Sequence, residues 1–396
     1  MKHNLPYFVT WSAQAQAIQI EVKKTLSDHY ILEDNRELYD LSSCSYHLSF
    51  GLRNKEIQDV IREQLDELPV LGPKFSFDLK RDASLQLLES LGLNGKIFYT
   101  TSGSETVENA LKMVRDITKK DLVLRRKNSY HGATLGSLSV TGDWRSENVT
   151  TLSDLSLTIP EPHEEDAIKK TEILIKENLD KGIAAIILET ITGGNGVIIP
   201  PKTWYQSIQE LCHKYDIKLI LDEVVCGFYR TGKNFGFHHY PFLKPDFICL
   251  SKAITGGFIP FGALYCSPKI SEFYDSNKLK CGLTNYAHPL GLRAMMEILN
   301  IINQEEFKDL VTKRTETLSS FLEEAKALPL VKEVRQIGLL AAVELKSNSL
   351  NQAELISHGI YVNIIGNNII LAPFLNTPQE NLRLALNKLN NFLKLK

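Results

Sequence analysis

The sequence predicts an α/β protein with a large domain, built on a mainly parallel sheet flanked by helices, and a smaller α+β domain formed by both ends of the chain. Short apolar runs rich in β-branched residues alternate with helical stretches between residues 96 and 267. This alternation is typical of a parallel sheet covered on both faces. After residue 289 the pattern changes to long helical stretches with isolated strands. A chain of 396 residues is long enough for two such domains.

Two elements precede the large sheet. The segment ELYDLSS (37–43) is predicted to be a strand, and RNKEIQDVIREQLDEL (53–68) is predicted to be one amphipathic helix. We expect the strand to belong to the small domain and the helix to begin the large one.

Six short apolar runs predict the strands of the large sheet. Most are bounded by charged residues or glycine, as buried strands usually are. They span residues 96–101, 121–126, 184–190, 217–224, 246–252 and 261–267. Two of the stretches between them repeat apolar residues at helical spacing, so that residues 105–120 and 203–215 are predicted to be crossover helices.

The rest of the chain begins with one long helical stretch from Pro289 to about Leu328. Then follow VKEVRQIGLLAAVELK (331–346), a short helix, IYVNIIGNNIILAPF (360–374) and a final amphipathic helix. We therefore divide the chain into three segments, and expect the first and third to pack together. Residues 1–50 are the N-terminal part of the small domain, 51–290 the large domain, and 291–396 a linker helix with the C-terminal part of the small domain.

Composition excludes several classes of protein. The net charge is -2, with 43% hydrophobic and 23% charged residues, which fits neither a disordered chain nor a basic nucleic-acid-binding surface. No apolar run is long enough to span a bilayer, and the N-terminus lacks the continuous apolar stretch of a signal peptide. Six scattered cysteines without a C-x-x-C pair, and histidines without ligand spacing, predict no zinc site. We expect a cytoplasmic protein without a membrane or nucleic-acid partner.

A strand that ends in Ser102-Gly103-Ser104 and runs directly into a helix is a candidate anion site. Glycine allows a tight turn, and the first helical N–H groups present unpaired donors beside the positive end of the helix dipole. A plain serine N-cap explains the same residues equally well. The motif taken alone does not decide between the two.

Asp222 and Lys252 each close an apolar strand. Acidic residues at the carboxyl ends of strands lie where open α/β sheets bind their ligands. A lysine at such a position costs desolvation energy unless it is paired or chemically used. The pair predicts a reactive site at this edge of the sheet.

Four runs then occur in the order found in one enzyme family. They are SGSE-x-x-E-x-A-x-K-x-x-R (102–115), SYHG (129–132), LDEV-x-x-G-x-x-RTGK (221–233) and PD-x-x-x-x-SKA-x-TGG (245–257). In these runs the chain resembles the class III aminotransferases, the ω-amino-acid branch of pyridoxal 5'-phosphate (PLP) enzymes of fold type I. WSAQ (11–14), GGNGVIIPP (193–201) and GLTNYAHPLG (282–291) further resemble the pyruvate-using amine, taurine and β-amino-acid transaminases. The similarity covers nearly the whole chain and implies a seven-stranded sheet in a large PLP-binding domain.

The resemblance implies roles for residues around the cofactor ring. Lys252 would form the internal aldimine and later move the proton between the cofactor and the substrate carbon. Asp222 would keep the pyridine nitrogen protonated, so that the ring accepts electrons. Tyr130 would stack on one face of the ring, and Val224 would pack on the other.

The resemblance also implies how the phosphate is held. Gly103 and Ser104 would bind it together with Thr284, which in this family arrives from the neighbouring subunit. The protein is therefore expected to be a homodimer with shared active sites. We expect His131 to position other groups rather than transfer protons, and Arg230 and Glu223 to form a structural pair.

Substrate recognition departs from the family pattern. Many relatives carry a mobile arginine that grips substrate carboxylates and otherwise pairs with the glutamate matching Glu189. Asn363 stands at the arginine's place here, which removes a bidentate carboxylate contact. Glu189 would then lack its usual partner, and an unpaired carboxylate in a partly buried site is costly unless a cationic or hydrogen-bonding group, such as one on the substrate, meets it.

This argument predicts that donors with a second amine or a hydroxyl outperform β-alanine and taurine. Tyr46 and Phe50 are expected to line the entrance as an aromatic wall, although they can equally be core residues of the small domain. Another arginine in the pocket, with Arg81 and Arg145 as candidates, would remove the basis for the prediction.

The predicted function is a PLP-dependent aminotransferase that moves an amino group from an amine or ω-amino donor to a carbonyl acceptor by a ping-pong mechanism. An aminomutase or racemase of the same fold needs the same Lys252 and Asp222, so the motifs do not separate it from a transaminase. A cofactor-binding regulator or degenerate homologue is disfavoured because both residues are retained.

Overall fold

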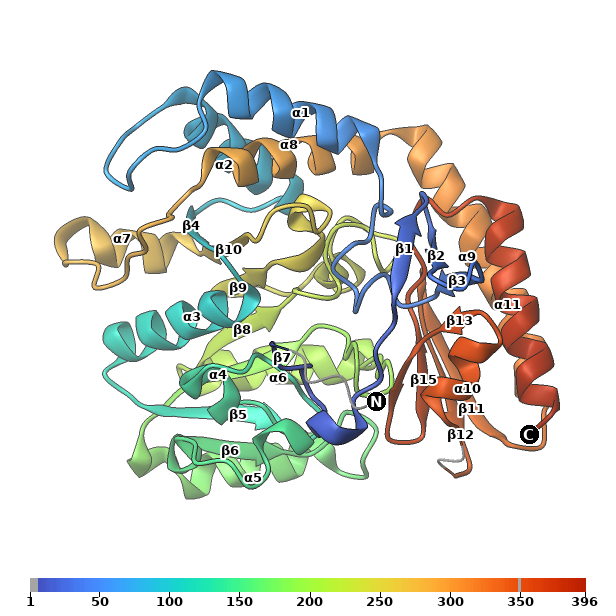
Figure 1. The fold of residues 1–396 in the computed structure, drawn as a ribbon. Coiled ribbons are helices and arrows are strands. Elements are labelled where there is room, and N and C mark those ends of the chain that lie inside the picture. Colours follow the sequence, from blue (N-terminus) through green and yellow to red (C-terminus); the bar gives the residue numbers. More distant parts are fainter. Residues whose placement is uncertain (1–5, 348–349) are drawn as a thin grey trace.

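A seven-stranded sheet is the centre of the larger part of the molecule (Figure 1). In spatial order its strands are β4 (Lys96–Thr100), β10 (Gly262–Cys266), β9 (Phe247–Leu250), β8 (Lys218–Asp222), β7 (Ile183–Glu189), β5 (Leu122–Arg126) and β6 (Ser156–Ile159). Strand β10 is antiparallel to both neighbours, and every other pairing is parallel. The computed structural model describes residues 6–347 and 350–396. The predicted α/β class with a mainly parallel sheet is confirmed.

Helices cover both faces of this sheet, and successive residues of each strand point to opposite faces. On one face, Ile187 and Ile220 pack with α3 (Gly103–Thr118) in one buried cluster. On the other face, Ile186 and Leu219 belong to the cluster that includes α6 (Lys202–Lys214). The other helices of the larger part are α1 (Lys55–Glu67), α2 (Asp78–Leu91), α4 (Leu135–Ser139), α5 (Ala167–Glu177) and α7 (Pro268–Ser276).

Local sequence signals set where two of these helices begin. The Asn54 side chain accepts a hydrogen bond from the Ile57 N–H and caps α1. The Ser102 hydroxyl accepts one from the Glu105 N–H, at 3.2 Å, and caps α3. Such side chains satisfy donors that the first helical turn leaves free. The predicted helices at 53–68, 105–120 and 203–215 are therefore found within about two residues of their expected ends.

Both ends of the chain form the smaller part of the molecule. One sheet joins β1 (Val22–Thr25), β2 (His29–Leu32), β3 (Glu37–Asp40) and β13 (Ile360–Tyr361). Strand β13 lies parallel to β3 and so connects the C-terminal region to the N-terminal one. A second, antiparallel sheet has the order β11 (Val331–Ile337), β12 (Leu340–Leu345), β15 (Asn368–Leu371) and β14 (Asn363–Ile365). The division at residues 50 and 290 stays a prediction.

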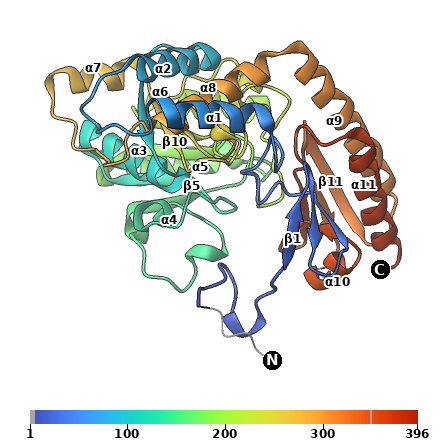
Figure 2. The same cartoon turned by 45° about the horizontal axis from the view of Figure 1, so that its top comes forward.

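The long helical stretch after residue 289 is two helices, not one. α8 (Pro289–Asn303) lies along the larger part, and α9 (Glu305–Lys326) belongs to the smaller part, where α10 (Gln352–Ser357) and α11 (Gln379–Lys394) complete the layer (Figures 1 and 2). The break falls at Gln304, whose backbone is extended at φ −71° and ψ 132°. Two glutamates in the next turn then favour a new helix start.

Within residues 6–347 and 350–396, no helix is both long enough and apolar enough to cross a membrane. The segment that precedes β1 extends from the smaller part toward the loops of the larger part (Figure 2). The first five residues of that segment lie outside the described part of the chain.

Candidate active site

A cavity of about 610 Å³ lies at the carboxyl ends of the parallel strands. This edge is where open α/β sheets bind ligands. Residues of the smaller part, among them Tyr361 and Asn363, line its other side. The predicted site residues that line it are Tyr46, Gly103, Ser104, Tyr130, Glu189, Asp222, Val224, Lys252 and Asn363. The structure therefore brings nine of the predicted residues together, whereas Thr284 and Phe50 do not line the cavity.

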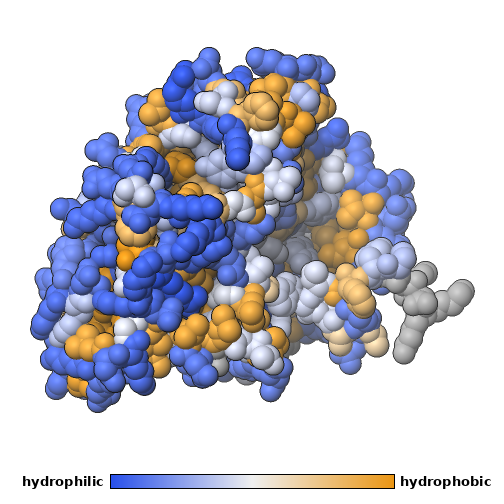
Figure 3. Space-filling model, turned by 90° about the vertical axis from the view of Figure 1, so that its left-hand side faces the viewer, coloured by the Kyte–Doolittle hydropathy of each residue, from blue (hydrophilic) through white to orange (hydrophobic). Residues whose placement is uncertain are grey.

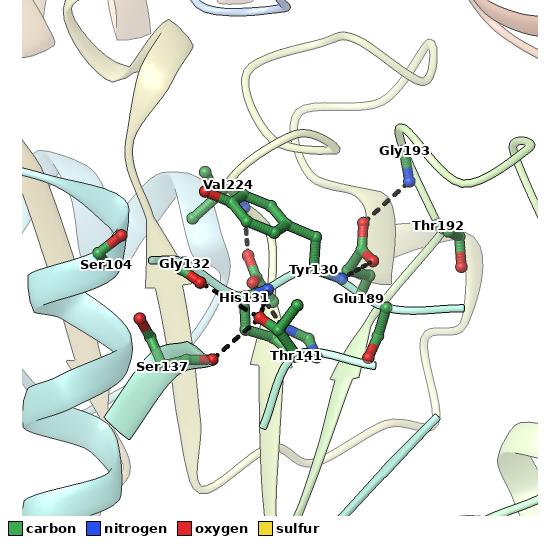
Figure 4. A network of polar contacts seen from close by, with 12 residues as sticks. Ser104, Tyr130, His131, Gly132, Ser137, Thr141, Glu189, Thr192, Gly193 and Val224 are labelled. Carbon is green, nitrogen blue, oxygen red and sulfur yellow. Dashed lines mark hydrogen bonds and ion pairs between the residues drawn. The ribbon is translucent and has the colours of Figure 1, made fainter. Parts of the chain in front are cut away.

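Asp222, the last residue of β8, is fixed by two hydrogen bonds. One carboxylate oxygen lies 2.8 Å from Nδ1 of His131, and the other accepts the Val224 N–H at 3.0 Å (Figure 4). The carboxylate and the imidazole are both buried. Nε2 of His131 has no hydrogen-bond partner among the described residues. His131 therefore orients Asp222, in agreement with a positioning role.

Lys252 follows β9 and begins a short 3-10 turn (Lys252–Thr255). Its backbone lies in the left-handed region at φ +50°, which is strained for a residue with a side chain. Burial lowers the pKa of its ammonium group, and the carboxylates of Asp222 and Glu189 oppose that shift. A lowered pKa favours the neutral amine, which is the nucleophilic form.

The start of α3 supplies the anion site. The helix has 16 residues, and its first turn contains Gly103 and Ser104. A Cβ at Gly103 would lie 3.2 Å from both methyl groups of Val224, so only glycine fits here without displacing its neighbour. The free N–H groups and the dipole of this helix end favour a phosphate. The N-cap of Ser102 coexists with this site, so the two explanations of the sequence motif are compatible.

Glu189, the last residue of β7, has partners that the sequence argument did not foresee. Its carboxylate accepts the Tyr130 N–H at 3.1 Å and the Gly193 N–H at 2.9 Å (Figure 4). Burial raises the pKa of this carboxyl group, and the Gly193 bond opposes the shift. No arginine or lysine of the described residues forms an ion pair with Glu189, but these backbone N–H groups satisfy its carboxylate, so the expectation that a substrate group must do so was wrong.

Tyr46 enters the cavity from a turn with an unusual backbone. Ser43, Cys44, Ser45 and Tyr46 all have positive φ, between 49° and 73°, and the Tyr46 N–H donates to the Ser42 carbonyl at 2.8 Å. Left-handed turns of this kind are costly for residues with side chains, and they cluster at functional sites. The carboxylate of Asp40 accepts the N–H groups of Ser42 and Cys44, which stabilises the turn. The result is a buried Tyr46 ring whose centroid lies 5.4 Å from Nζ of Lys252.

Phe50 does not share this position. Its side chain is fully buried and stacks on Phe307 at a centroid distance of 5.7 Å, inside the main core. The predicted aromatic wall of Tyr46 and Phe50 was therefore wrong for Phe50. The turn after Tyr46 sends the chain back into the core, and sequence spacing does not reveal that reversal.

Arg145 is in the cavity, and Arg81 is not. The Arg145 guanidinium lies 4.2 Å from the centroid of the Tyr130 ring and pairs with Asp143. Arg81 lies on the exposed side of α2, where it pairs with Asp78. The basis for preferring diamine or hydroxyl donors is therefore removed.

Arg230 and Glu223 do not form the expected pair. The Arg230 guanidinium donates to the carbonyls of Leu339, at 3.0 Å, and Pro373, at 2.7 Å, and so ties the larger part to the C-terminal region. Glu223 instead accepts hydrogen bonds from the Thr190 hydroxyl and from the N–H groups of Gly236 and Phe237. The two side chains belong to one sequence run but have separate partners.

The site contains what PLP requires. The amine of Lys252 can react with the aldehyde of PLP, and the fixed carboxylate of Asp222 suits a protonated ring nitrogen. The N-terminus of α3 suits the phosphate. Tyr130 supplies an aromatic face. Among the described residues no cluster of three His, Cys, Asp or Glu side chains could hold a metal ion.

Comparisons with known proteins agree with this reading of the site. Residues 10–393 match the model of the family Aminotransferase class-III. Gamma aminobutyrate transaminase 2 of Solanum lycopersicum is 31% identical over 343 residues, which cover 74% of this chain and 73% of that protein. Putrescine–pyruvate aminotransferase of Pseudomonas aeruginosa is 28% identical over 389 residues, which cover 90% and 84%. The structure of taurine:2-oxoglutarate aminotransferase from Bifidobacterium kashiwanohense, in complex with PLP and glutamate, has a TM-score of 0.91 at 27% identity and covers 98% of this chain and 95% of that one.

The fold and the site thus define a PLP-dependent transferase of fold type I. The chain belongs to the class III aminotransferases. PLP is its cofactor and transamination is its reaction, as the resemblance predicted. No observation favours an aminomutase or a racemase.

Proposed function

We propose that this aminotransferase works through Lys252, with a primary amine as donor and a carbonyl compound as acceptor in two separate half-reactions. The observation that carries the proposal is the shared cavity of Lys252, Asp222 and the start of α3. Bound PLP supplies an aldehyde that captures amines and a ring that accepts electrons.

Each residue then has a defined task. The Lys252 amine would hold the cofactor and would take up and return the proton at the substrate's reacting carbon. Asp222, oriented by His131, would keep the ring nitrogen protonated. Ser104 and the first N–H groups of α3 would bind the phosphate. Tyr130 and Val224 would cover the two ring faces and exclude water.

The proposal includes a homodimer in which Thr284 completes the phosphate site of the neighbouring subunit. Thr284 is exposed and does not line the cavity of its own chain. Large apolar side chains are also exposed, including Val70, Phe75 and Leu279, in the loop between α1 and α2 and in the segment after α7. Figure 3 turns this side of the molecule toward the viewer and shows apolar side chains open to solvent among polar ones. A subunit interface on this side would cover these side chains.

We also propose a cytoplasmic location. All six cysteines carry free thiols, and four of them are buried. Reduced cysteines in a chain of this size suit a reducing compartment.

A half-reaction experiment tests the proposed chemistry. Holoenzyme mixed with an amine donor and no acceptor should release one carbonyl product per active site and then stop. Addition of a carbonyl acceptor should restart the reaction. Repeated turnover of the donor alone into an isomer, without a released carbonyl compound, would contradict transamination.

A further inference from the structure

The sequence named Arg145 as a candidate pocket arginine, and the structure shows what holds it there. Three aromatic rings surround its guanidinium carbon, which lies 4.2 Å from the Tyr130 centroid, 5.2 Å from that of Trp144 and 5.5 Å from that of Trp11. Contacts of this kind stabilise a guanidinium through cation–π attraction and leave its edges available for hydrogen bonds. The rings hold Arg145 in one place over the cavity.

Asp143 fixes the orientation of this guanidinium. One of its carboxylate oxygens accepts Nη1 of Arg145 at 2.5 Å and also the side-chain amide of Asn195 at 3.0 Å. The other oxygen accepts the Arg145 backbone N–H at 3.0 Å. Three hydrogen bonds thus fix the Asp143 carboxylate, and the fixed carboxylate in turn orients the Arg145 guanidinium.

The opposite edge of the guanidinium is free. Nε and Nη2 of Arg145 donate to no protein acceptor in the part of the chain that the structure describes, and neither atom is sealed from solvent. These two nitrogens form the side-on fork that binds a carboxylate with two parallel hydrogen bonds. Because Arg145 lines the cavity, an anionic group inside it can reach that fork.

Asp143 pairs with one edge of the Arg145 guanidinium, and the other charged groups of the cavity leave its second edge for a substrate. Among the described residues that line it, Lys252 and Arg145 are the arginine and lysine side chains. Lys252 is committed to the cofactor in the proposed function. The carboxylate of Glu189 is held by backbone N–H groups and does not neutralise Arg145.

The nearby polar groups suit the same ligand. The Tyr46 hydroxyl is buried, lines the cavity and makes no hydrogen bond of good geometry with the described residues. Burial raises its pKa to about 12, and the side chain of Asn363 and the charge of Arg145 limit that rise. The hydroxyl therefore remains a donor at neutral pH, next to the residue that replaces the family's arginine.

We infer that Arg145 is a specificity-determining residue that binds the carboxylate of the substrate, with the Tyr46 hydroxyl as a second donor, in place of the arginine that many relatives carry at the position of Asn363. The inference rests on the proposed function, in which the amino end of the substrate reacts at Lys252. It replaces the sequence-based preference for diamines and amino alcohols. The carboxylate contact comes from the segment between α4 and β6 instead of the C-terminal domain.

The test compares two donors of equal length, 4-aminobutanoate and butylamine, which differ by the carboxylate. Single-turnover rates with holoenzyme give a selectivity ratio for wild type, Arg145→Gln and Arg145→Lys. Loss of hydrogen bonds to a charged group is expected to lower the selectivity ratio by roughly 10- to 100-fold. We expect Arg145→Gln to lower the ratio by that factor and Arg145→Lys, which keeps the charge without the fork, to lower it less. Arg81→Gln removes an exposed arginine outside the cavity and is the matched control.

A binding measurement makes the result independent of turnover. Calorimetric titration of holoenzyme with butanoate should show an affinity that falls about 10-fold or more in Arg145→Gln and stays within about 2-fold in Arg81→Gln. Equal selectivity and equal butanoate affinity in wild type and Arg145→Gln would overturn the inference while leaving the aminotransferase function intact. Loss of butanoate affinity in Arg145→Gln, in a protein that converts neither amine, would support the carboxylate site and count against the proposed function.

Discussion

Nδ1 of His131 lies 2.8 Å from a carboxylate oxygen of Asp222, and both side chains are buried at the end of β8. The backbone N–H of Val224 holds the other oxygen. This arrangement fixes a carboxylate that, in the proposed function, would pair with the ring nitrogen of PLP. His131 thereby gives Asp222 a fixed orientation, as the expected positioning role requires.

Asp222→Asn should lower the turnover number by roughly three orders of magnitude, because a neutral amide does not stabilise a protonated pyridine. His131→Phe should cost less, about 10- to 100-fold, since the Asp222 charge remains and only its orientation is lost. Steady-state kinetics and circular dichroism of both variants check this. Near-normal turnover in Asp222→Asn would show that another acid serves the ring.

Glu223 should make stability depend on pH. Burial raises the pKa of this carboxyl group from 4.5 to about 7, against the hydrogen bonds of Thr190, Gly236 and Phe237. Between these two pH values the folded protein keeps a proton that the unfolded chain has lost, so the free energy of unfolding falls as pH rises, by up to about 1.4 kcal/mol per pH unit.

Urea denaturation of wild type and Glu223→Gln at pH 5, 6 and 7 measures this effect. The variant cannot titrate at residue 223, so its free energy of unfolding should fall less steeply over the range. Parallel curves for the two proteins would mean that Glu223 is ionised throughout.

The strands and the cofactor motifs were predictable from the sequence because their signals are local. Apolar runs, strand-end acids and the Ser102 cap each occupy a few neighbouring residues, and the six predicted strands match β4, β5, β7, β8, β9 and β10. Strand β6 was not predicted, since it is a four-residue edge strand with a mixed burial pattern. The break at Gln304 was missed because helical periodicity continues on both sides of it.

The substrate side of the cavity was harder to predict because it depends on contacts between distant segments. The partners of Glu189 are backbone N–H groups, which no side-chain pattern reveals. Arg145 packs in the cavity against Trp11, which lies more than 130 residues before it in the chain. Phe50 and Tyr46 are four residues apart, yet a left-handed turn sends one to the core and the other to the cavity.

Thr284→Val should weaken PLP binding about 10-fold if this residue is a phosphate ligand supplied across a subunit interface, since one hydrogen bond to a charged group is lost. Fluorescence titration of apoenzyme with PLP measures the change. Sedimentation of the active holoenzyme should give twice the mass of the chain. A fully active monomer would contradict the shared site.

The most direct test of the account is the covalent attachment of PLP to Lys252. Holoenzyme reduced with sodium borohydride and digested with trypsin should carry the cofactor's added mass on the peptide that contains Lys252, and Lys252→Ala should carry none and lose the visible absorbance of the bound cofactor. The adduct on a different lysine, or an unchanged spectrum in Lys252→Ala, would contradict the assignment.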